Sequence, residues 1–398
     1  MKPEPTTKDS SAKGLAIYVH WPFCLAKCPY CDFNSHVRDD LGELDQSAWT
    51  AAYIKDLRHD LVRLKKDTGP ATSLFFGGGT PSLMTGKTVA AIIDDVENSL
   101  GFSADAEITL EANPTSVEAT RFRDYVSAGV NRFSLGVQAL RDDDLKALGR
   151  QHSVAEALAA VEVARRHCEN ISFDLIYARS GQKLADWQIE LNEALEFAPT
   201  HLSLYQLTIE RGTRFFERWK QGDLILPDED LASNMFDLTN AACASQGLAA
   251  YEVSNYARPG FESRHNISYW QSDPYIGIGP GAHGRLDCDQ GRLATTRLRS
   301  PEKWLGQIAK ADHGLESDDV VSGDMLVAEV LMMGLRLMSG LTETRFKSLT
   351  GKTFAQALPA EHLDDLIDGG FVTLDNNVLA ATAQGRNVLN VVTEKLLT

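Results

Sequence analysis

The chain has 398 residues, of which 43% are hydrophobic and 24% are charged, and its formal net charge is −16 at pH 7. This length suits a main domain of TIM-barrel size and a second module. The negative charge argues against a general nucleic-acid-binding protein, because a protein that neutralises phosphates needs a basic face. We therefore expect a globular protein without a nucleic-acid partner.

The beginning of the chain predicts neither a signal peptide nor a membrane helix. Residues 1–13 are polar and include Pro3 and Pro5, so we expect a flexible tail over 1–14. The longest uncharged run, 68–86, is rich in Gly, Pro and Thr, which does not suit a bilayer-spanning helix. The expected location is the cytoplasm.

Short apolar runs alternate with longer amphipathic segments over the first 200 residues or so. A helical stripe such as Trp49, Tyr53 and Leu57 follows a strand-like run, and this repetition predicts a parallel sheet covered by helices. Six such units fit either an open barrel or a doubly wound sheet. The expected strands are Leu15–Val19, Thr72–Phe76, Ile108–Glu111, Arg132–Val137, Ser172–Ile176 and His201–Leu207.

The pattern changes after about residue 299, where we place the start of a second domain that runs to 398. An apolar helical stretch is followed by the short helix Glu361–Ile367, a glycine pair and a hairpin with Asn376-Asn377 at its turn. This order is typical of a winged-helix-like α+β module. Because Glu361, Asp364 and Asp365 make the presumed recognition helix acidic, we expect it to pack or dock a partner rather than bind DNA.

Three of the six cysteines, Cys24, Cys28 and Cys31, form a C-x3-C-x2-C run directly after the first strand. Three thiolates can hold three irons of a cubane cluster and leave the fourth iron open to a ligand. A zinc site with His20 or His36 as the fourth ligand, or three unrelated thiols, are the alternatives. The spacing favours the cluster, because tetrahedral zinc sites usually pair C-x2-C or C-x4-C units across a longer gap.

Other motifs follow the strands at the edge where barrels build their sites. The glycine run before Thr80 can bring backbone close to a ligand and offer free N–H groups, although alone it is more often a turn. Asp174 lies inside an apolar strand, where a carboxylate is costly unless it has a partner. The run His265-Asn266-Ile267-Ser268-Tyr269-Trp270 offers an imidazole, a normal heme ligand, beside aromatic rings; the alternative is a structural histidine that caps a turn.

With Tyr30 between the last two cysteines, the run resembles the C-x3-C-x-aromatic-C signature of the radical S-adenosylmethionine superfamily. The closer similarity, from about Leu15 to the C-terminus, is to the oxygen-independent coproporphyrinogen III oxidase family and the related HemW-type heme chaperones. The resemblance implies an α/β fold: a partial (β/α)6 TIM-like barrel over 15–298, then the small winged-helix-like domain. It also implies a [4Fe–4S] cluster on the three cysteines and S-adenosylmethionine contacts from Tyr18, Tyr30, Gly78, Gly79, Thr80, Glu111, Gln138, Arg150 and Asp174.

Within this group, the oxidases carry another cysteine two residues beyond the signature, where this chain has Phe33. The chain also has a short N-terminal arm, and its H-N-x-x-Y-W motif matches the chaperone branch. The resemblance therefore implies a heme chaperone, with His265 as a heme-contact candidate and His283 as a second one. Such a protein would receive heme from a donor and insert it into respiratory cytochromes at the inner membrane face, with a homodimer as one expected assembly.

Two other functions remain open from the sequence. The enzyme alternative is a coproporphyrinogen III dehydrogenase, which removes two propionate carboxyls through a 5′-deoxyadenosyl radical. A zinc-bearing structural adaptor is the third class.

Overall fold

The structure is a computed structural model that describes residues 14–38 and 44–398. The tail expected over 1–14 therefore lies outside the described residues, apart from Gly14. Within the described residues, a twelve-stranded sheet forms the main body, in the order β14-β13-β12-β11-β1-β4-β5-β6-β7-β8-β10-β9. Its central parallel strands are β1 (Leu15–Trp21), β4 (Ala71–Gly78), β5 (Phe102–Ala112), β6 (Arg132–Gln138), β7 (Asn170–Tyr177) and β8 (His201–Gln206).

These six strands coincide with the six predicted ones, and each pairs in parallel with the next along the chain. A doubly wound sheet would reverse its strand order near the middle, and these six do not. Antiparallel strands extend both ends of the sheet, which does not close into a full barrel. The predicted partial barrel is confirmed. The flanking strands are β9 (Ala249–Ala250), β10 (Asn255–Ala257), β11 (Tyr275–Ile278), β12 (His283–Cys288), β13 (Gly291–Arg297) and β14 (Leu315–Val321), of which β11 is parallel to β1.

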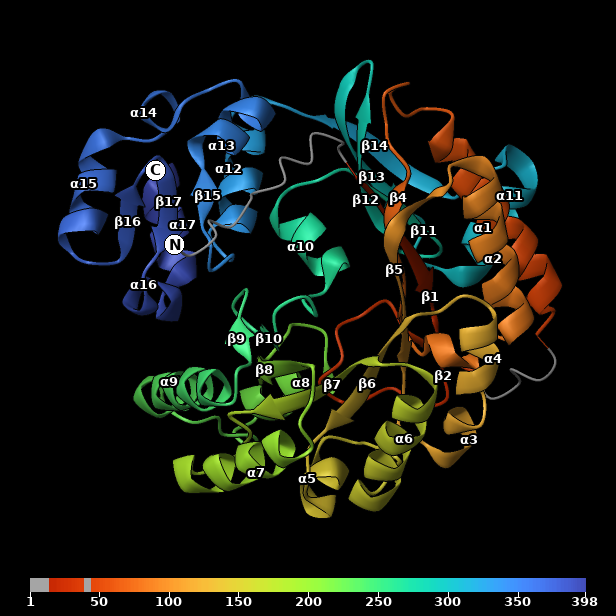
Figure 1. Ribbon diagram of the computed structural model, residues 1–398, viewed down its shortest axis with the longest axis horizontal. Helices are drawn as coiled ribbons and strands as arrows, with labels where there is room; N and C mark the ends of the chain where they lie inside the picture. Colours follow the sequence, from red (N-terminus) through yellow and green to blue (C-terminus); the bar gives the residue numbers. More distant parts are fainter. Residues whose placement is uncertain (1–13, 39–43) are drawn as a thin grey trace, which may run out of the picture.

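Helices cover the outer face of the curved sheet (Figure 1). In α1 the predicted stripe is buried: Trp49, Tyr53 and Leu57 are at most 3% exposed. Side-chain caps fix several helix starts, as in α6, where Ser153 and Glu156 form a capping box. The helices of this body are α1 (Gln46–Leu61), α2 (Gly86–Ser99), α3 (Ser116–Ala119), α4 (Phe122–Ser127), α5 (Asp142–Ala147), α6 (Val154–His167), α7 (Leu184–Glu196), α8 (Arg214–Lys220), α9 (Glu229–Ser245), α10 (Arg264–Trp270) and α11 (Pro301–Ala311).

Helix α10 differs from the others because it packs against β4 from the inner side of the sheet (Figure 1). Its first turn is fixed by Glu107 of β5, whose carboxylate accepts hydrogen bonds from the Ser263 hydroxyl at 3.3 Å and from the His265 backbone at 3.4 Å. This helix carries the H-N-x-x-Y-W motif. The motif therefore lies inside the barrel, near the start of β4 rather than at its carboxyl end.

A separate hydrophobic core begins later than the boundary predicted at 299. Helix α11 packs on α1 through stacked Trp49 and Trp304 rings, 5.5 Å apart between centroids, and β14 belongs to the large sheet. The second core starts with α12 and includes Val330 and Leu379. Its elements are α12 (Gly323–Gly334), β15 (Leu341–Thr342), α13 (Glu343–Thr350), α14 (Phe354–Ala357), α15 (Ala360–Asp368), β16 (Val372–Asp375), β17 (Val378–Ala381), α16 (Ala383–Asn387) and α17 (Leu389–Leu397).

The predicted hairpin is present in this second unit. Strands β16 and β17 pair in an antiparallel register, and Asn376 and Asn377 occupy the turn with φ of 52° and 62°. Asparagine tolerates this left-handed conformation better than most residues. The acidic helix α15 buries Leu363 and Leu366 in the core of the unit.

Polar contacts join the two units. The Arg285 guanidinium donates to both carboxylate oxygens of Glu329 at 3.0 and 2.9 Å, and Arg345 pairs with Asp273. Among the helices that the structure describes, none has the length and apolar character needed to cross a bilayer.

Candidate functional site

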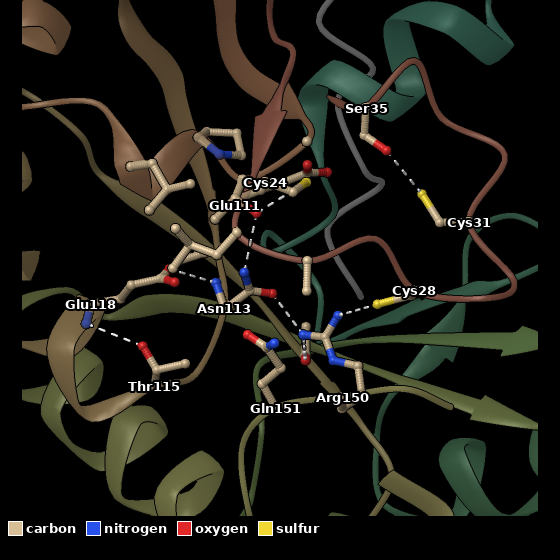
Figure 2. Close-up of a pocket in the computed structure, with 18 of the residues that line it drawn as sticks. Cys24, Cys28, Cys31, Ser35, Glu111, Asn113, Thr115, Glu118, Arg150 and Gln151 are labelled. Carbon is tan, nitrogen blue, oxygen red and sulfur yellow. Dashed lines mark hydrogen bonds between the residues drawn. The ribbon is translucent and has the colours of Figure 1, made fainter. Parts of the chain in front are cut away.

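A cavity of about 880 Å³ opens at the carboxyl ends of the central strands. The cysteine loop forms one wall, and residues in or just after β4, β5, β6 and β7 form much of the rest (Figure 2). The structure brings together most of the predicted site residues around this cavity. They are Cys24, Cys28, Tyr30, Cys31, Gly78, Gly79, Thr80, Glu111, Gln138, Arg150 and Asp174.

The cysteine loop leaves the end of β1 and is closed by a short pair of strands. Cys24 ends β2 (Phe23–Cys24), which pairs with β3 (His36–Val37), and the loop between them carries the other two cysteines. Cys24 is buried, whereas Cys28 and Cys31 are partly exposed. In Figure 2 the three sulfur atoms lie around one open space.

The glycine run supports this loop from below. The Gly79 amide donates to the Trp21 carbonyl at 2.6 Å, and the Thr80 amide donates to the Phe23 carbonyl at 2.9 Å. A Cβ on residue 79 would lie 2.7 Å from that Phe23 oxygen, so only glycine allows this approach. The Gly78 amide, at a residue with φ of 110°, donates to Glu111 at 3.2 Å.

The prediction that the glycine run offers free N–H groups is therefore wrong for residues 78–80, because these amides bind other parts of the protein. Their role is to hold the cysteine loop against the strand ends. The signal was ambiguous because close backbone approach requires glycine whether the neighbour is a ligand or another segment of the chain.

Each cysteine sulfur has a polar side chain beside it (Figure 2). The Thr80 hydroxyl donates to Cys24 Sγ at 3.4 Å, and an Arg150 guanidinium nitrogen donates to Cys28 Sγ at 3.5 Å. Cys31 Sγ lies 3.6 Å from the hydroxyl oxygen of its loop neighbour four residues on, Ser35. Hydrogen-bond donors at this distance suit sulfur that carries negative charge.

The surroundings of these donors fit an iron–sulfur cluster better than a zinc ion that uses His20 as its fourth ligand. Burial raises the pKa of the Cys24 thiol to about 11, so its thiolate forms only when a cation binds it. Both ring nitrogens of His20 are already bonded, to the Tyr18 hydroxyl at 3.0 Å and the Asn34 carbonyl at 2.9 Å. In the part of the chain that the structure describes, no set of three or more His, Cys, Asp or Glu side chains converges as on a single metal ion.

Two carboxylates, Glu111 and Asp174, face the cavity from β5 and β7. Burial, with the nearby charge of Asp174, raises the pKa of Glu111 to about 8. Burial also raises the pKa of Asp174 to about 6, against a hydrogen bond from Ser134 at 3.3 Å. A positively charged ligand placed between them would lower both pKa values, so this wall is suited to bind a cation.

Gln138, on the strand between β5 and β7, and Arg150 also line the cavity. Gln138 has a φ of 73°, which is rare for a residue other than glycine. If residue 136 had a Cβ, that atom would lie 2.9 Å from the side-chain nitrogen of Gln138. The Gly136 carbonyl accepts a hydrogen bond from Arg150 at 2.8 Å. The small residue at position 136 thus makes room for both side chains.

Tyr18, His265 and His283 do not line the cavity. Tyr18 lies beneath it and bonds His20. His265 is 1% exposed, and its two ring nitrogens bond the Ser73 hydroxyl at 2.9 Å and the Tyr269 hydroxyl at 2.7 Å. His283 is exposed at the start of β12.

The sequence interpretation did not assign Ser35, Asn113 or Ser134 to the site. Asn113 lies two positions after Glu111 in the run Glu111-Ala112-Asn113-Pro114, and that run could have pointed to it. Ser35 and Ser134 carry no such signal, because a serine in a loop or strand is ordinarily a solvated or structural residue.

Comparisons with known proteins agree with this arrangement. The sequence model of the radical SAM superfamily matches residues 18–192, and that of the HemN C-terminal domain matches residues 321–388. The heme chaperone HemW of Escherichia coli (strain K12) is 37% identical over 386 residues, which cover 96% of this chain and 98% of that protein. The mitochondrial radical S-adenosyl methionine domain-containing protein 1 of Danio rerio is 37% identical over 395 residues, which cover 98% of this chain and 88% of that protein.

Among solved structures, the coproporphyrinogen III oxidase HemN of Escherichia coli superposes with a TM-score of 0.78 and covers 97% of this chain and 90% of that one. Its sequence identity is 20%, so this likeness shows the fold alone. The fold, the cysteine-lined cavity and the matched sequence models together define a radical S-adenosylmethionine protein. Within that superfamily, the chain belongs to the family of the heme chaperone HemW.

Proposed function

We propose that this protein is a heme chaperone with a [4Fe–4S] cluster on Cys24, Cys28 and Cys31 and an S-adenosylmethionine site beside it. It receives heme from a donor protein in the cytoplasm and delivers it to respiratory cytochromes at the inner membrane face, acting as a homodimer. The observation that carries the proposal is the identity to heme chaperones across both domains, 37% over 96% of the chain for one of them.

When bound, the cluster supplies an electron and one iron with an open position for the amino and carboxylate groups of S-adenosylmethionine. The chain's own residues bind and orient that cofactor. Glu111 and Asp174 favour its positive charges, and Gln138 and Arg150 line the same cavity. Tyr30, within the cysteine loop, packs with its ring centroid 6.2 Å from that of Phe215 in α8 and so limits the loop's movement.

The surroundings of Phe33 support a chaperone over a decarboxylating oxidase. This side chain lines the mouth of the cavity and is 60% exposed, where the resembling oxidases carry a further cysteine. An anaerobic assay with reconstituted cluster, reductant, S-adenosylmethionine and coproporphyrinogen III tests the choice. We expect no protoporphyrinogen above the level of a single turnover, and sustained turnover would overturn the chaperone proposal.

For heme contact, the H-N-x-x-Y-W helix remains the proposed region. In the described conformation both nitrogens of His265 are bonded, and burial lowers its pKa to about 3, so the imidazole is neutral. A neutral imidazole can ligate iron, but His265 must first give up its bond to Ser73 or to Tyr269, and because it is 1% exposed α10 must move to admit heme. His283 needs no such change, because it is exposed.

Hemin titration followed by absorbance separates these two histidines. We expect His265→Ala to weaken hemin binding at least about tenfold and to change the Soret band, with His283→Ala close to wild type. Circular dichroism and thermal unfolding control for the fold of the buried variant. Unchanged binding in a folded His265→Ala variant would remove His265 from the heme site.

A further inference from the structure

Polar side chains connect the sulfurs of Cys24 and Cys28 through a continuous chain of hydrogen bonds. Every bond in this chain is donated in the direction away from Arg150. Arg150 donates to the Asn113 side-chain oxygen at 2.7 Å and to Cys28 Sγ at 3.5 Å. The Asn113 amide nitrogen donates to the Thr80 hydroxyl oxygen at 3.2 Å, and that hydroxyl donates to Cys24 Sγ at 3.4 Å. Figure 2 shows the part of this chain around Asn113 and Arg150.

The direction is fixed by chemistry. A guanidinium can only donate, so the Asn113 oxygen must face Arg150 and its amide nitrogen must face Thr80. The Thr80 oxygen then accepts from Asn113, and its proton is directed to the sulfur of Cys24. Thr80 is 5% exposed, so water offers this proton little alternative. The Arg150 guanidinium thus donates a hydrogen bond directly to the Cys28 sulfur. Through the neutral side chains of Asn113 and Thr80, it also orients the hydrogen bond to the Cys24 sulfur.

The third sulfur has a partner from its own loop. The Ser35 hydroxyl lies 3.6 Å from Cys31 Sγ and is buried, while its backbone carbonyl accepts from Lys27 at 3.3 Å. This carbonyl bond fixes the backbone that places the hydroxyl. All three sulfurs of the motif therefore face a side-chain donor.

We propose that Ser35 and the Arg150–Asn113–Thr80 chain raise the reduction potential of the cluster by hydrogen bonding to its cysteine sulfurs. The inference rests on the proposed cluster. One-electron reduction adds negative charge that is shared with the sulfurs, and donors aimed at them stabilise the reduced state more than the oxidised one. These residues are positioning residues for the cluster, and Ser35 and Asn113 have this role in addition to any contact with S-adenosylmethionine.

The test is a dye-mediated potentiometric titration of anaerobically reconstituted protein without S-adenosylmethionine, read by electron paramagnetic resonance. We expect Ser35→Ala and Thr80→Val each to lower the equilibrium constant for one-electron reduction of the cluster by up to about tenfold. This change corresponds to a fall of about 59 mV in its reduction potential. Ser35→Thr retains a hydroxyl and should return toward wild type. Thr85→Val is the matched control, because Thr85 lines the same cavity but its hydroxyl bonds the Thr88 amide at 3.2 Å.

The direction of the chain has its own test. Asn113→Asp removes the donor to Thr80 and offers the hydroxyl an acceptor instead, so its proton turns away from Cys24. The shift caused by Asn113→Asp should therefore be smaller in a Thr80→Val background than in wild type, since no hydroxyl is left to turn. Equal shifts in both backgrounds would overturn the relay through Thr80.

The two proposals fail differently. Ser35→Ala and Thr80→Val variants that bind full iron and sulfide and titrate like wild type would overturn the role of these hydroxyls and leave the cluster in place. A wild-type chain that takes up no iron and sulfide would overturn the cluster itself.

Discussion

At the scale of single residues, the cavity contains two carboxyl groups whose ionised forms the protein alone stabilises poorly. Glu111 accepts one backbone hydrogen bond, from Gly78, and faces Asp174. Both pKa values are raised, mainly by burial. Such an arrangement costs stability without a ligand and favours one that is positively charged, as the sulfonium and ammonium of S-adenosylmethionine are.

Replacing Glu111 by Gln should separate the cost to stability from the contribution to cofactor binding. The pKa of Glu111 rises from 4.5 to about 8 on folding, so its stabilising contribution is complete below pH 4.5 and is lost as the pH rises through 8. Glu111→Gln should therefore unfold like wild type at about pH 4, below the unfolded-state pKa. At about pH 8.5 it should be more stable by about 1.4 kcal/mol or more, the value of one pKa unit.

Thermal unfolding of the cofactor-free protein at the two pH values measures this difference. Calorimetric titration should show at least about tenfold weaker S-adenosylmethionine binding by the same variant, since it loses a charge-assisted contact. A melting temperature that does not depend on the substitution at either pH would contradict the raised pKa.

His265 is a residue for which the sequence pattern and the structure point to different environments. The pattern indicates an imidazole available to heme, but the ring stacks on Phe75 with centroids 4.8 Å apart and uses both nitrogens. Nothing in a linear motif specifies on which side of the sheet α10 packs, because that depends on contacts with Ser73 about 190 positions away in the chain. The cysteine loop and Glu111 could be placed from the sequence, since the loop follows β1 and Glu111 lies at the end of β5, whereas Arg150 comes after α5 and was assigned only from the family resemblance.

At the scale of elements, the parallel strands were predictable because they are buried on both faces and read as apolar runs. The flanking antiparallel strands were not. Strand β14 reads Leu-Glu-Ser-Asp-Asp-Val-Val and lies at one end of the sheet, where polar side chains face solvent. For the same reason, no apolar pattern marks β14, which follows the predicted domain boundary, as part of the large sheet.

The hairpin of the second domain gives a prediction at this scale. Asn377 has a left-handed backbone that glycine adopts at no cost and β-branched residues resist. Asn377→Gly should leave stability unchanged or raise it by a few tenths of a kcal/mol, whereas Asn377→Val should lower it by about 1–2 kcal/mol. Hydrogen exchange of the β16 and β17 amides in the full chain reports the change, and equal protection in both variants would contradict it.

At the scale of the whole molecule, a buried ion network joins the first helix, α1, to strand β13 near one end of the large sheet. Asp56 and Asp60 of α1 and Arg297 of β13 are all fully buried, with Arg297 Nε 3.0 Å from Asp56 and its terminal nitrogen 2.6 Å from Asp60. Asp56 also accepts from the Trp304 indole at 3.1 Å and the Gly314 amide at 2.9 Å. One carboxylate thus fixes the first helix to segments more than 220 residues later.

Removing this charge should be costly. Asp56→Asn leaves Arg297 with fewer compensating contacts, and we expect a loss of about 3–5 kcal/mol in the free energy of unfolding, as for other broken buried pairs. The control is Lys55→Ala, which removes an exposed pair with Asp312 and should cost at most about 1 kcal/mol. Urea denaturation measures the free energy of unfolding of both variants. Similar losses in the two would contradict a larger contribution of the buried network to stability.

The same network has a consequence for biosynthesis. Asp56 leaves the ribosome 241 residues before Arg297, and at about 5–20 residues per second the interval is about 10–50 s. Throughout that time the Asp56 carboxylate lacks its buried partner Arg297. We therefore expect α1 to stay hydrated and loosely docked against β1. Because β1 leads directly into the cysteine loop, we expect the proposed cluster to be loaded only after translation has ended.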